Sequence, residues 1–242
     1  MKMRTLLLAM AMAVTLPAFA EPDAKMTDAA KEEAATPIPH KGVFGSERIT
    51  YRVEAGETYI DNDEGEPTAS LFTTSYIKEN AGAQRPVTFV FNGGPGSASV
   101  WLHLGLLGPK RAVVASDADA DDGAAPYTLV DNPLSILDQT DLVFIDPVGT
   151  GFSRAIGKGE NKDYWSEAGD GGSISEFIRI WITQHKRWNA PKYLIGESFG
   201  TTRAAYIANQ LTTGDVDIAL NGLVLISQAL DYEGSTSVHD NV

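Results

Sequence analysis

Short apolar runs alternate along this chain with stretches in which apolar residues recur at helical spacing. The apolar runs have the length and the β-branched or aromatic content of buried strands, and they occupy 87–91, 141–146, 193–196 and 222–227. Helical spacing is clearest at 174–182 and at 201–211. Buried strands separated by such helices predict an α/β fold with a mostly parallel central sheet and helices on both faces.

The segment before the first buried run has a different pattern, because polar residues occupy alternate positions. Arg48–Val53 and Thr58–Ile60 are rich in β-branched and aromatic residues, and Ala55-Gly56 between them predicts the turn of a β-hairpin. Asp61–Gly65 predicts a polar turn, and Ser70–Ile77 predicts another strand. We therefore expect an antiparallel β-hairpin region in front of the parallel sheet.

Three further patterns have structural interpretations. Ser173–Glu176 has the Ser-x-x-Glu spacing of a capping box, which predicts a helix start after a polar loop at 157–172. His185 falls in the last turn of that helix, where positive charge is favourable, so we assign it no catalytic role. His103 lies in an apolar stretch and is expected to be a packed side chain rather than a base.

The first twenty residues have the pattern of a secretory signal peptide. Lys2 and Arg4 precede an apolar run, and the small residues up to Ala20 predict cleavage after that position. The run is too short to span a membrane, so we expect a secreted or periplasmic protein without stable membrane insertion. The predicted organisation is a signal peptide at 1–20, a disordered leader at 21–40 and a globular domain at 41–242.

Composition narrows the range of partners. The chain carries 19 Lys and Arg against 32 Asp and Glu, and its net charge of −13 argues against nucleic acid as a partner. It has no cysteine, which excludes disulfides, zinc–thiolate sites and a thiol nucleophile. We expect no cofactor and no metal site.

The segment Gly196–Gly200 reads Gly-Glu-Ser-Phe-Gly and lies between an apolar run and a helical stretch. This is the strand–turn–helix context of a nucleophile elbow, in which glycines permit a tight turn and the serine stands at its tip. A chance match is the alternative for the bare pattern, and the flanking strand and helix favour catalysis. Ser198 is therefore the candidate nucleophile.

A second glycine-rich loop, Asn92–Ser97, follows the buried run at 87–91, at a strand end where α/β sheets place binding loops. Hydrolases with a nucleophile elbow take one oxyanion donor from the residue after the serine and another from such an early loop. The expected donors are the backbone N–H groups of Phe199 and Gly94, and a plain Gly-Pro turn is the structural alternative. Asp146–Ser153 is a third glycine-rich loop, so we expect three loops at one edge of the sheet.

Three motifs in this order carry a family resemblance: Asn-Gly-Gly-Pro-Gly-Ser at 92–97, Asp-Pro-Val-Gly-Thr-Gly-Phe-Ser at 146–153 and Gly-Glu-Ser-Phe-Gly at 196–200. Together with Asn-Pro-Leu-Ser at 132–135, they resemble the serine carboxypeptidases of peptidase family S10, over about residues 87–231. The resemblance implies an α/β-hydrolase fold, an acyl-enzyme on a serine, and peptide substrates with a free C-terminus.

The resemblance also implies roles for individual positions. They are the nucleophile Ser198, the oxyanion-hole amides of Gly94 and Phe199, and the pair Asn92 and Glu197, which hold the terminal carboxylate of the substrate. A protonated Glu197 can donate a hydrogen bond to that carboxylate. Many family members carry an aromatic residue where this chain has Val90, which affects the shape of the terminal pocket.

The catalytic triad is expected to be incomplete in this chain. In the α/β-hydrolase fold the acid and the histidine follow the serine on loops after later strands. Forty-four residues follow Ser198, and their one histidine, His239, comes eight residues after Asp231 with no predicted strand between them. We therefore expect the triad Asp and His not to be in this chain, which resembles the amino-terminal part of a carboxypeptidase without its carboxyl-terminal strands and cap.

Two other classes of function fit the same residues. The scaffold supports many chemistries, so another serine hydrolase or an acyltransferase is one alternative. The other alternative is a non-catalytic protein that captures peptide C-termini. Tests of acyl donors, and of how peptide binding depends on Ser198 and Asn92, separate these classes.

Overall fold

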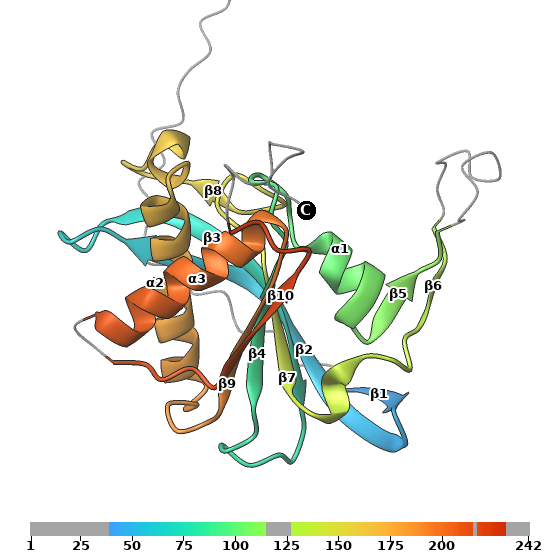
Figure 1. Ribbon diagram of the computed structural model, residues 1–242. Coiled ribbons are helices and arrows are strands. Elements are labelled where there is room, and N and C mark those ends of the chain that lie inside the picture. Colours follow the sequence, from blue (N-terminus) through green and yellow to red (C-terminus); the bar gives the residue numbers. More distant parts are fainter. Residues whose placement is uncertain (1–38, 115–126, 215–216, 231–242) are drawn as a thin grey trace, which may run out of the picture. The chain divides into compact units, whose positions relative to one another are not determined.

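The computed structural model describes residues 39–114, 127–214 and 217–230 (Figure 1). The expected signal peptide and residues 21–38 of the expected leader lie outside these ranges. The first strand, β1, begins at Pro39 and therefore includes the last two residues of the predicted leader. No helix in the described ranges combines the length and the apolar content that crossing a membrane requires.

One sheet runs through the fold, with the strand order β1-β2-β3-β7-β4-β9-β10 (Figure 1). β7, β4, β9 and β10 are parallel neighbours, whereas β1, β2 and β3 are antiparallel and lie on one side of them. The strands of this sheet are β1 (Pro39–Phe44), β2 (Glu47–Asp61), β3 (Pro67–Lys78), β4 (Val87–Phe91), β7 (Asp141–Ile145), β9 (Lys192–Glu197), β10 (Gly222–Ile226) and the short β8 (Arg154–Ala155), which pairs with β3. Separately, β5 (Lys110–Ala112) pairs with β6 (Leu129–Asp131). The predicted α/β fold, with antiparallel strands ahead of a mostly parallel sheet, is confirmed.

Helices cover both faces of the sheet. On one face, α2 (Glu167–Gln184) and α3 (Phe199–Thr213) pack against Phe89 and Phe91 of β4. On the other face, Val90 of β4 lies in a second apolar cluster with residues of the short helical segments. These segments are α1 (Val100–Leu102), η1 (His103–Leu107) and η2 (Ile136–Asp138). The last residue of η3 (Asn161–Tyr164) packs against the first cluster instead. The uninterrupted apolar sequence of β4 therefore reflects burial on both sides.

The predicted hairpin turn at Ala55-Gly56 is wrong. β2 continues through these residues, and both pair with β3. The chain turns later, at the predicted polar turn, where Gly65 has a φ of 76°. Local turn propensity is overridden at Ala55-Gly56, because continuous pairing with β3 satisfies the backbone hydrogen bonds of an extended strand.

The predicted helix start at Ser173 is also wrong, since α2 begins at Glu167 and includes the end of the expected loop. Ser166 is the N-cap, and its hydroxyl accepts a hydrogen bond from a first-turn amide at 3.1 Å. By local propensity glycine favours a loop, but in α2 the missing side chain of Gly171 allows close packing against another helix. A Cβ on Gly171 would lie 2.4 Å from the ring of Tyr206 in α3, so the two helices approach closely at this point.

β10 lies at the edge of the sheet in the part of the chain that the structure describes. A strand is present where the sequence predicts one, but its expected burial is not observed, since Leu223 is 40% and Val224 is 48% exposed. β10 pairs with β9 on one side, and no described strand lies on the other. Apolar sequence at an open strand edge favours pairing with a further strand.

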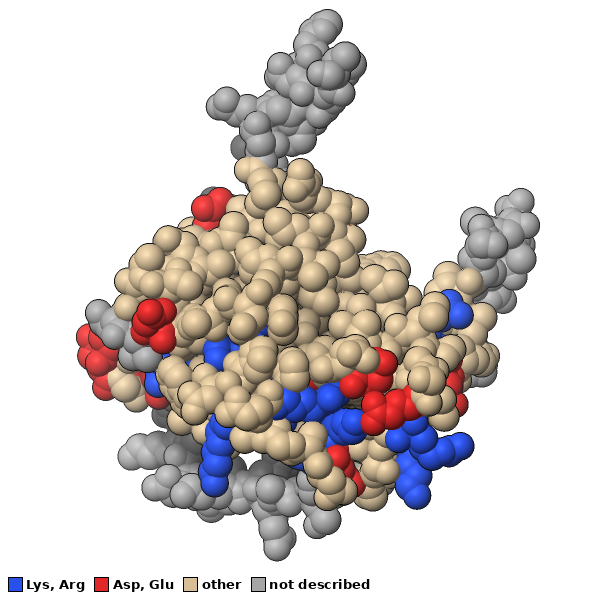
Figure 2. Space-filling view, turned by 60° about the horizontal axis from the view of Figure 1, so that its bottom comes forward, with Lys and Arg blue, Asp and Glu red and all other residues tan. Residues whose placement is uncertain are grey.

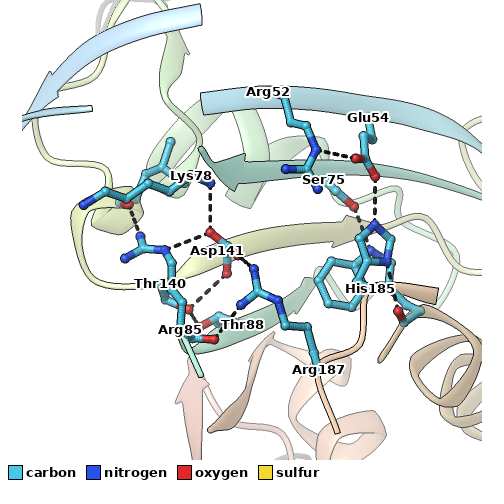
Figure 3. A network of polar contacts seen from close by, with 12 residues as sticks. Arg52, Glu54, Ser75, Lys78, Arg85, Thr88, Thr140, Asp141, His185 and Arg187 are labelled. Carbon is cyan, nitrogen blue, oxygen red and sulfur yellow. Dashed lines mark hydrogen bonds and ion pairs between the residues drawn. The ribbon is translucent and has the colours of Figure 1, made fainter. Parts of the chain in front are cut away.

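A buried charge network joins the amino ends of the central strands (Figure 3). Asp141, at the start of β7, is fully buried, and its carboxylate accepts hydrogen bonds from Arg85 at 2.9 Å and from Arg187 at 2.6 Å. It also accepts one from the Lys78 amide of β3 at 3.0 Å. One carboxylate thus links β3 and β7 to the segments that lead into β4 and β9.

On the face that Figure 2 turns forward, Lys and Arg lie beside Asp and Glu instead of forming a patch of one sign.

We predict that Asp141→Asn lowers the free energy of unfolding by about 3–5 kcal/mol, because two buried guanidinium groups lose their counter-charge. Asp131→Asn is the matched control. Asp131 pairs with Lys110 at the surface, its side chain is 76% exposed, and its replacement should cost at most about 1 kcal/mol. Urea unfolding followed by circular dichroism measures both losses, and equal losses would contradict the role of the network.

A hydrogen bond between side chains ties the end of α2 to β2. His185 is the C-cap of α2, with Nε2 at 2.8 Å from a Glu54 carboxylate oxygen and Nδ1 at 2.9 Å from the Trp181 carbonyl. The hydrogen bond from His185, with further help from Arg52, outweighs burial and holds the pKa of Glu54 at about 2. His185 therefore has the structural role expected for it, through a partner that the sequence did not reveal.

Glu54 contributes stability above its ordinary pKa of 4.5, and this contribution is lost as the pH falls from 4.5 through about 2. We predict that Glu54→Gln lowers the melting temperature at about pH 6, and that its difference from the parent chain shrinks toward about pH 2. Glu64→Gln, at an exposed turn position, is the control. Calorimetric melting curves across this range test the prediction, which fails if the difference stays constant with pH.

Candidate active site

The nucleophile elbow predicted from the sequence is present between β9 and α3. Ser198 stands between the strand and the helix with a φ of 56° and a ψ of −125°, a conformation that residues other than glycine rarely adopt. Its amide donates to the Ile226 carbonyl of β10 at 2.9 Å, and its carbonyl accepts from the Thr201 amide at 2.9 Å. These hydrogen bonds hold the strained serine at the tip of the turn.

Glycines allow the elbow to lie directly against the loop after β4. A Cβ on Gly93 would lie 2.4 Å from the Phe199 amide nitrogen, and a Cβ on Gly196 would lie 2.1 Å from the Gly200 carbonyl oxygen. Because any side chain at either position would collide with main-chain atoms, both require glycine. The main chains of the two loops are therefore in contact.

Parallel pairing of β4 and β9 puts Asn92 and Glu197 side by side. Phe91 is paired with Gly196, so the next residues of the two segments are neighbours. The Asn92 side-chain nitrogen donates to a Glu197 carboxylate oxygen at 3.1 Å, and its side-chain oxygen accepts from the Leu102 amide at 3.0 Å. Asn92 is 1% exposed, and these two bonds fix its orientation.

Ser198 lies at a cavity of about 580 Å³, and Asn92, Gly94 and Glu197 line the same cavity. Four of the five site residues predicted from the sequence therefore border one space. Apolar groups form much of the remaining wall, including Trp101, which is 70% exposed. The cavity combines polar groups from two strand ends with an aromatic ring at the surface.

The fifth predicted residue, Phe199, lines a neighbouring cavity of about 240 Å³. Its amide nitrogen nevertheless lies next to the loop after β4, as the close approach of Gly93 shows. In that loop Gly94 has a φ of 104°, a backbone conformation that glycine adopts readily and that strains other residues. The structure thus brings the main chain of Phe199 to the loop that contains Gly94.

Arg203 of α3 is buried and contacts the main chain of the candidate site. The sequence patterns did not indicate this residue. Its guanidinium donates to the Asp170 carboxylate of α2 at 2.7 Å and to the Asn92 carbonyl, and it lies 5.3 Å from the centre of the Phe199 ring. Burial raises the pKa of Asp170, and Arg203 opposes this shift. The one signal in the sequence that could have indicated Arg203 is its position directly before Ala204, where the apolar face of the predicted helix begins.

No described histidine lines the Ser198 cavity. His103 is a packed, half-buried side chain, as predicted, with its ring stacked on that of Phe144 at 4.3 Å and Nε2 at 2.6 Å from the Tyr76 hydroxyl. Asp217 follows the far end of α3, roughly 20 Å along the helix axis from the elbow. Asp231 and His239 lie outside the described residues. Within the described ranges, no group of three His, Asp or Glu side chains is arranged to hold a metal ion.

The parallel sheet, the elbow after β9 and the glycine loop after β4 define an α/β-hydrolase fold. The crystal structure of KEX1(delta)p, a prohormone-processing carboxypeptidase from Saccharomyces cerevisiae, has a similar fold with a TM-score of 0.53. The match covers 72% of this chain and 38% of that one, at 21% identity. The sequence model of the serine carboxypeptidase family, peptidase S10, matches residues 47–239, and the chain belongs to this family.

Curated relatives agree with this assignment. Serine carboxypeptidase-like 16 from Arabidopsis thaliana is 27% identical over 192 residues, which are 76% of this chain and 42% of that protein. Pheromone-processing carboxypeptidase KEX1 from Cryptococcus gattii serotype B is 30% identical over 158 residues, which are 64% of this chain and 22% of that protein. The chain therefore spans less than half the length of these relatives, and the family resemblance predicted from the three motifs is confirmed.

We predict that Gly93→Ala destabilises the fold by about 1–3 kcal/mol and weakens ligand binding at the Ser198 cavity, because its Cβ must push the elbow away from β4. Gly82→Ala is the control, since a Cβ on Gly82 meets no atom within 4 Å. Urea unfolding and peptide titration of both variants provide the measurement. An unchanged Gly93→Ala protein would show that the contact between the two loops is not essential.

Proposed function

We propose that this chain provides the nucleophile and the substrate-binding pair of a serine carboxypeptidase that removes C-terminal residues from peptides. The observation that carries the proposal is the cavity that Ser198 shares with the hydrogen-bonded pair Asn92 and Glu197. An amide donor beside a carboxyl group suits a terminal carboxylate, since a protonated Glu197 donates a hydrogen bond as Asn92 does. A peptide held by its terminal carboxylate presents its last peptide bond to Ser198.

In this proposal the hydroxyl oxygen of Ser198 attacks the carbonyl carbon of the last peptide bond. The backbone N–H groups of Gly94 and Phe199 stabilise the negative charge on the carbonyl oxygen. The C–N bond then breaks, the C-terminal amino acid leaves with a proton, and water hydrolyses the remaining acyl-enzyme ester. The contact between Gly93 and the Phe199 amide supports the oxyanion role, because it keeps the two donor segments together.

We also propose that the Asp and His of the triad are not among residues 1–242. The absence of a described histidine from the lining of the Ser198 cavity supports this. In this fold both residues follow strands that come later in the chain than the elbow. Without a general base the serine hydroxyl is a weak nucleophile, so the chain by itself is proposed to bind substrate and to turn it over slowly.

The protein is proposed to act in the periplasm or outside the cell. The support is the pattern at 1–20, in which a basic start, an apolar run and a small-residue cleavage site predict export. Peptides with free C-termini are the proposed substrates, and nucleic acid is not a proposed partner, because the chain is strongly acidic.

We predict that the 242-residue chain binds a short peptide with a free C-terminal carboxylate at least about tenfold more tightly than the same peptide with a C-terminal amide. The reason is that Asn92 and Glu197 recognise the carboxylate itself. Release of the C-terminal residue should be slower than in a complete serine carboxypeptidase by on the order of a thousandfold or more. Isothermal titration and amino-acid release assays measure the two quantities.

Four variants separate the parts of this prediction. Ser198→Ala should retain peptide binding, and so should Glu197→Gln, because glutamine keeps an uncharged hydrogen-bond donor at this position. Asn92→Ala and Glu197→Ala should lose the preference for the carboxylate over the amide. Equal binding of acid and amide by the parent chain would overturn the carboxylate site. Ordinary peptidase rates would overturn only the proposal that the triad is incomplete. Tight binding without any acyl-enzyme, even from an activated ester, would favour a protein that captures peptide C-termini without catalysis.

A further inference from the structure

A second cavity, of about 320 Å³, lies at the glycine-rich loop that follows β7. It shares no lining residue with the Ser198 cavity, and its volume falls in the range of small-molecule sites. Its walls include the rings of Phe72, Phe144 and Phe152, the ring of His103, and one carboxylate, Asp146. None of these residues has a role in the proposed peptidase reaction.

The position of Asp146 is fixed by contacts from three segments. One carboxylate oxygen accepts a hydrogen bond from the Ser99 amide at 2.8 Å. The Asp146 amide donates to the Phe72 carbonyl at 3.1 Å, and the Asp146 carbonyl accepts from the Ser153 hydroxyl at 2.6 Å. A Cβ on Gly151 would lie 2.1 Å from the other carboxylate oxygen, so glycine makes room for this side chain. The carboxylate is therefore preorganised.

This carboxylate has no cationic partner in the part of the chain that the structure describes. No ion pair includes Asp146, and no Lys or Arg lines the cavity. Burial raises the pKa of Asp146, and the Ser99 amide opposes the shift. Burial also lowers the pKa of His103 to about 4, so that ring is uncharged at neutral pH and does not repel a cation. When the Asp146 carboxyl group is ionised, no cationic side chain in the lining of the cavity balances its charge.

The walls around this charge are aromatic. Phe72 and Phe152 meet edge to face with their ring centres 5.1 Å apart, and Phe152 is 70% exposed at the surface. Phe144 forms part of the inner wall and is 2% exposed. Aromatic rings around a carboxylate attract an organic cation, because the ring faces carry partial negative charge and the apolar walls accept its alkyl groups.

We propose that the Asp146 cavity binds an organic ammonium group, with Asp146 as the counter-charge and the phenylalanine rings as the walls. A strongly hydrated inorganic cation gains little from aromatic walls, whereas an alkylammonium ion buries its carbon atoms there. The ammonium group belongs either to a free small amine or to a lysine side chain. This site does not depend on the proposed peptidase reaction, since Ser198 does not line the cavity.

Two matched pairs of probes test the proposal on the 242-residue chain. Choline is compared with its neutral isostere 3,3-dimethylbutan-1-ol, and Nα-acetyl-lysine methylamide is compared with Nα-acetyl-norleucine methylamide. We expect at least one cation to bind with a dissociation constant of about 1 mM or lower, and its neutral partner to bind at least about tenfold more weakly. The pair that shows this difference identifies the source of the ammonium group.

Asp146→Asn keeps the oxygen that accepts from the Ser99 amide and removes the charge, so it should weaken cation binding at least about tenfold. Phe152→Leu, at an exposed position, should weaken it without disturbing the fold. Asp63→Asn makes the same change of charge at an exposed turn outside this cavity and should leave binding unchanged. Titration of each folded variant, checked by its circular dichroism spectrum, gives the result. Failure of both cations to bind, equal binding of the neutral isosteres, or an unaffected Asp146→Asn protein would each overturn the proposal.

Discussion

The loop after β4 and the nucleophile elbow have their main chains in contact, and the geometry of the candidate site depends on that contact. Gly93 and Gly196 leave no room for a Cβ where the chain packs against itself. Because β4 and β9 are parallel neighbours, the same arrangement puts Asn92 against Glu197 at the cavity of Ser198. A change that separates the two strands would therefore displace Ser198 and the pair Asn92 and Glu197 together.

Buried ion pairs hold both ends of these strands. At the amino ends Asp141 binds Arg85 and Arg187, and at the carboxyl ends Arg203 binds Asp170 and a main-chain carbonyl of the site. Such pairs add little net stability, because desolvation offsets their attraction, but removing one partner is costly. Each pair joins segments that are distant in the sequence, so the loss of one partner leaves the other charge buried and unpaired at one end of these strands.

Two cavities at the carboxyl edge of the sheet differ in chemistry. The Ser198 cavity is lined by a hydroxyl, the Asn92 amide, the Glu197 carboxyl group and glycine backbone, and in the proposed function these groups receive a substrate with a carboxylate. The Asp146 cavity offers one carboxylate among aromatic rings, which suits a cation. The two have no lining residue in common, although the segment that follows β4 contributes residues to both. Loops at this edge can carry separate sites on one scaffold.

The sequence by itself determined the features whose signal lies in a few consecutive residues. The apolar run of β4, the glycine-flanked turn at Ser198 and the order of the three family motifs predicted the fold, the elbow and the family. The same local signals led to wrong predictions of a turn at Ala55-Gly56 and of a loop at the start of α2. At these positions strand pairing and helix packing outweigh the turn propensity of glycine. Only the tertiary structure decided that Arg203 supports Asn92 from 111 positions away and that Asp146 borders a cavity of its own. These features depend on strand order and on contacts between distant segments, which no local pattern of residues contains.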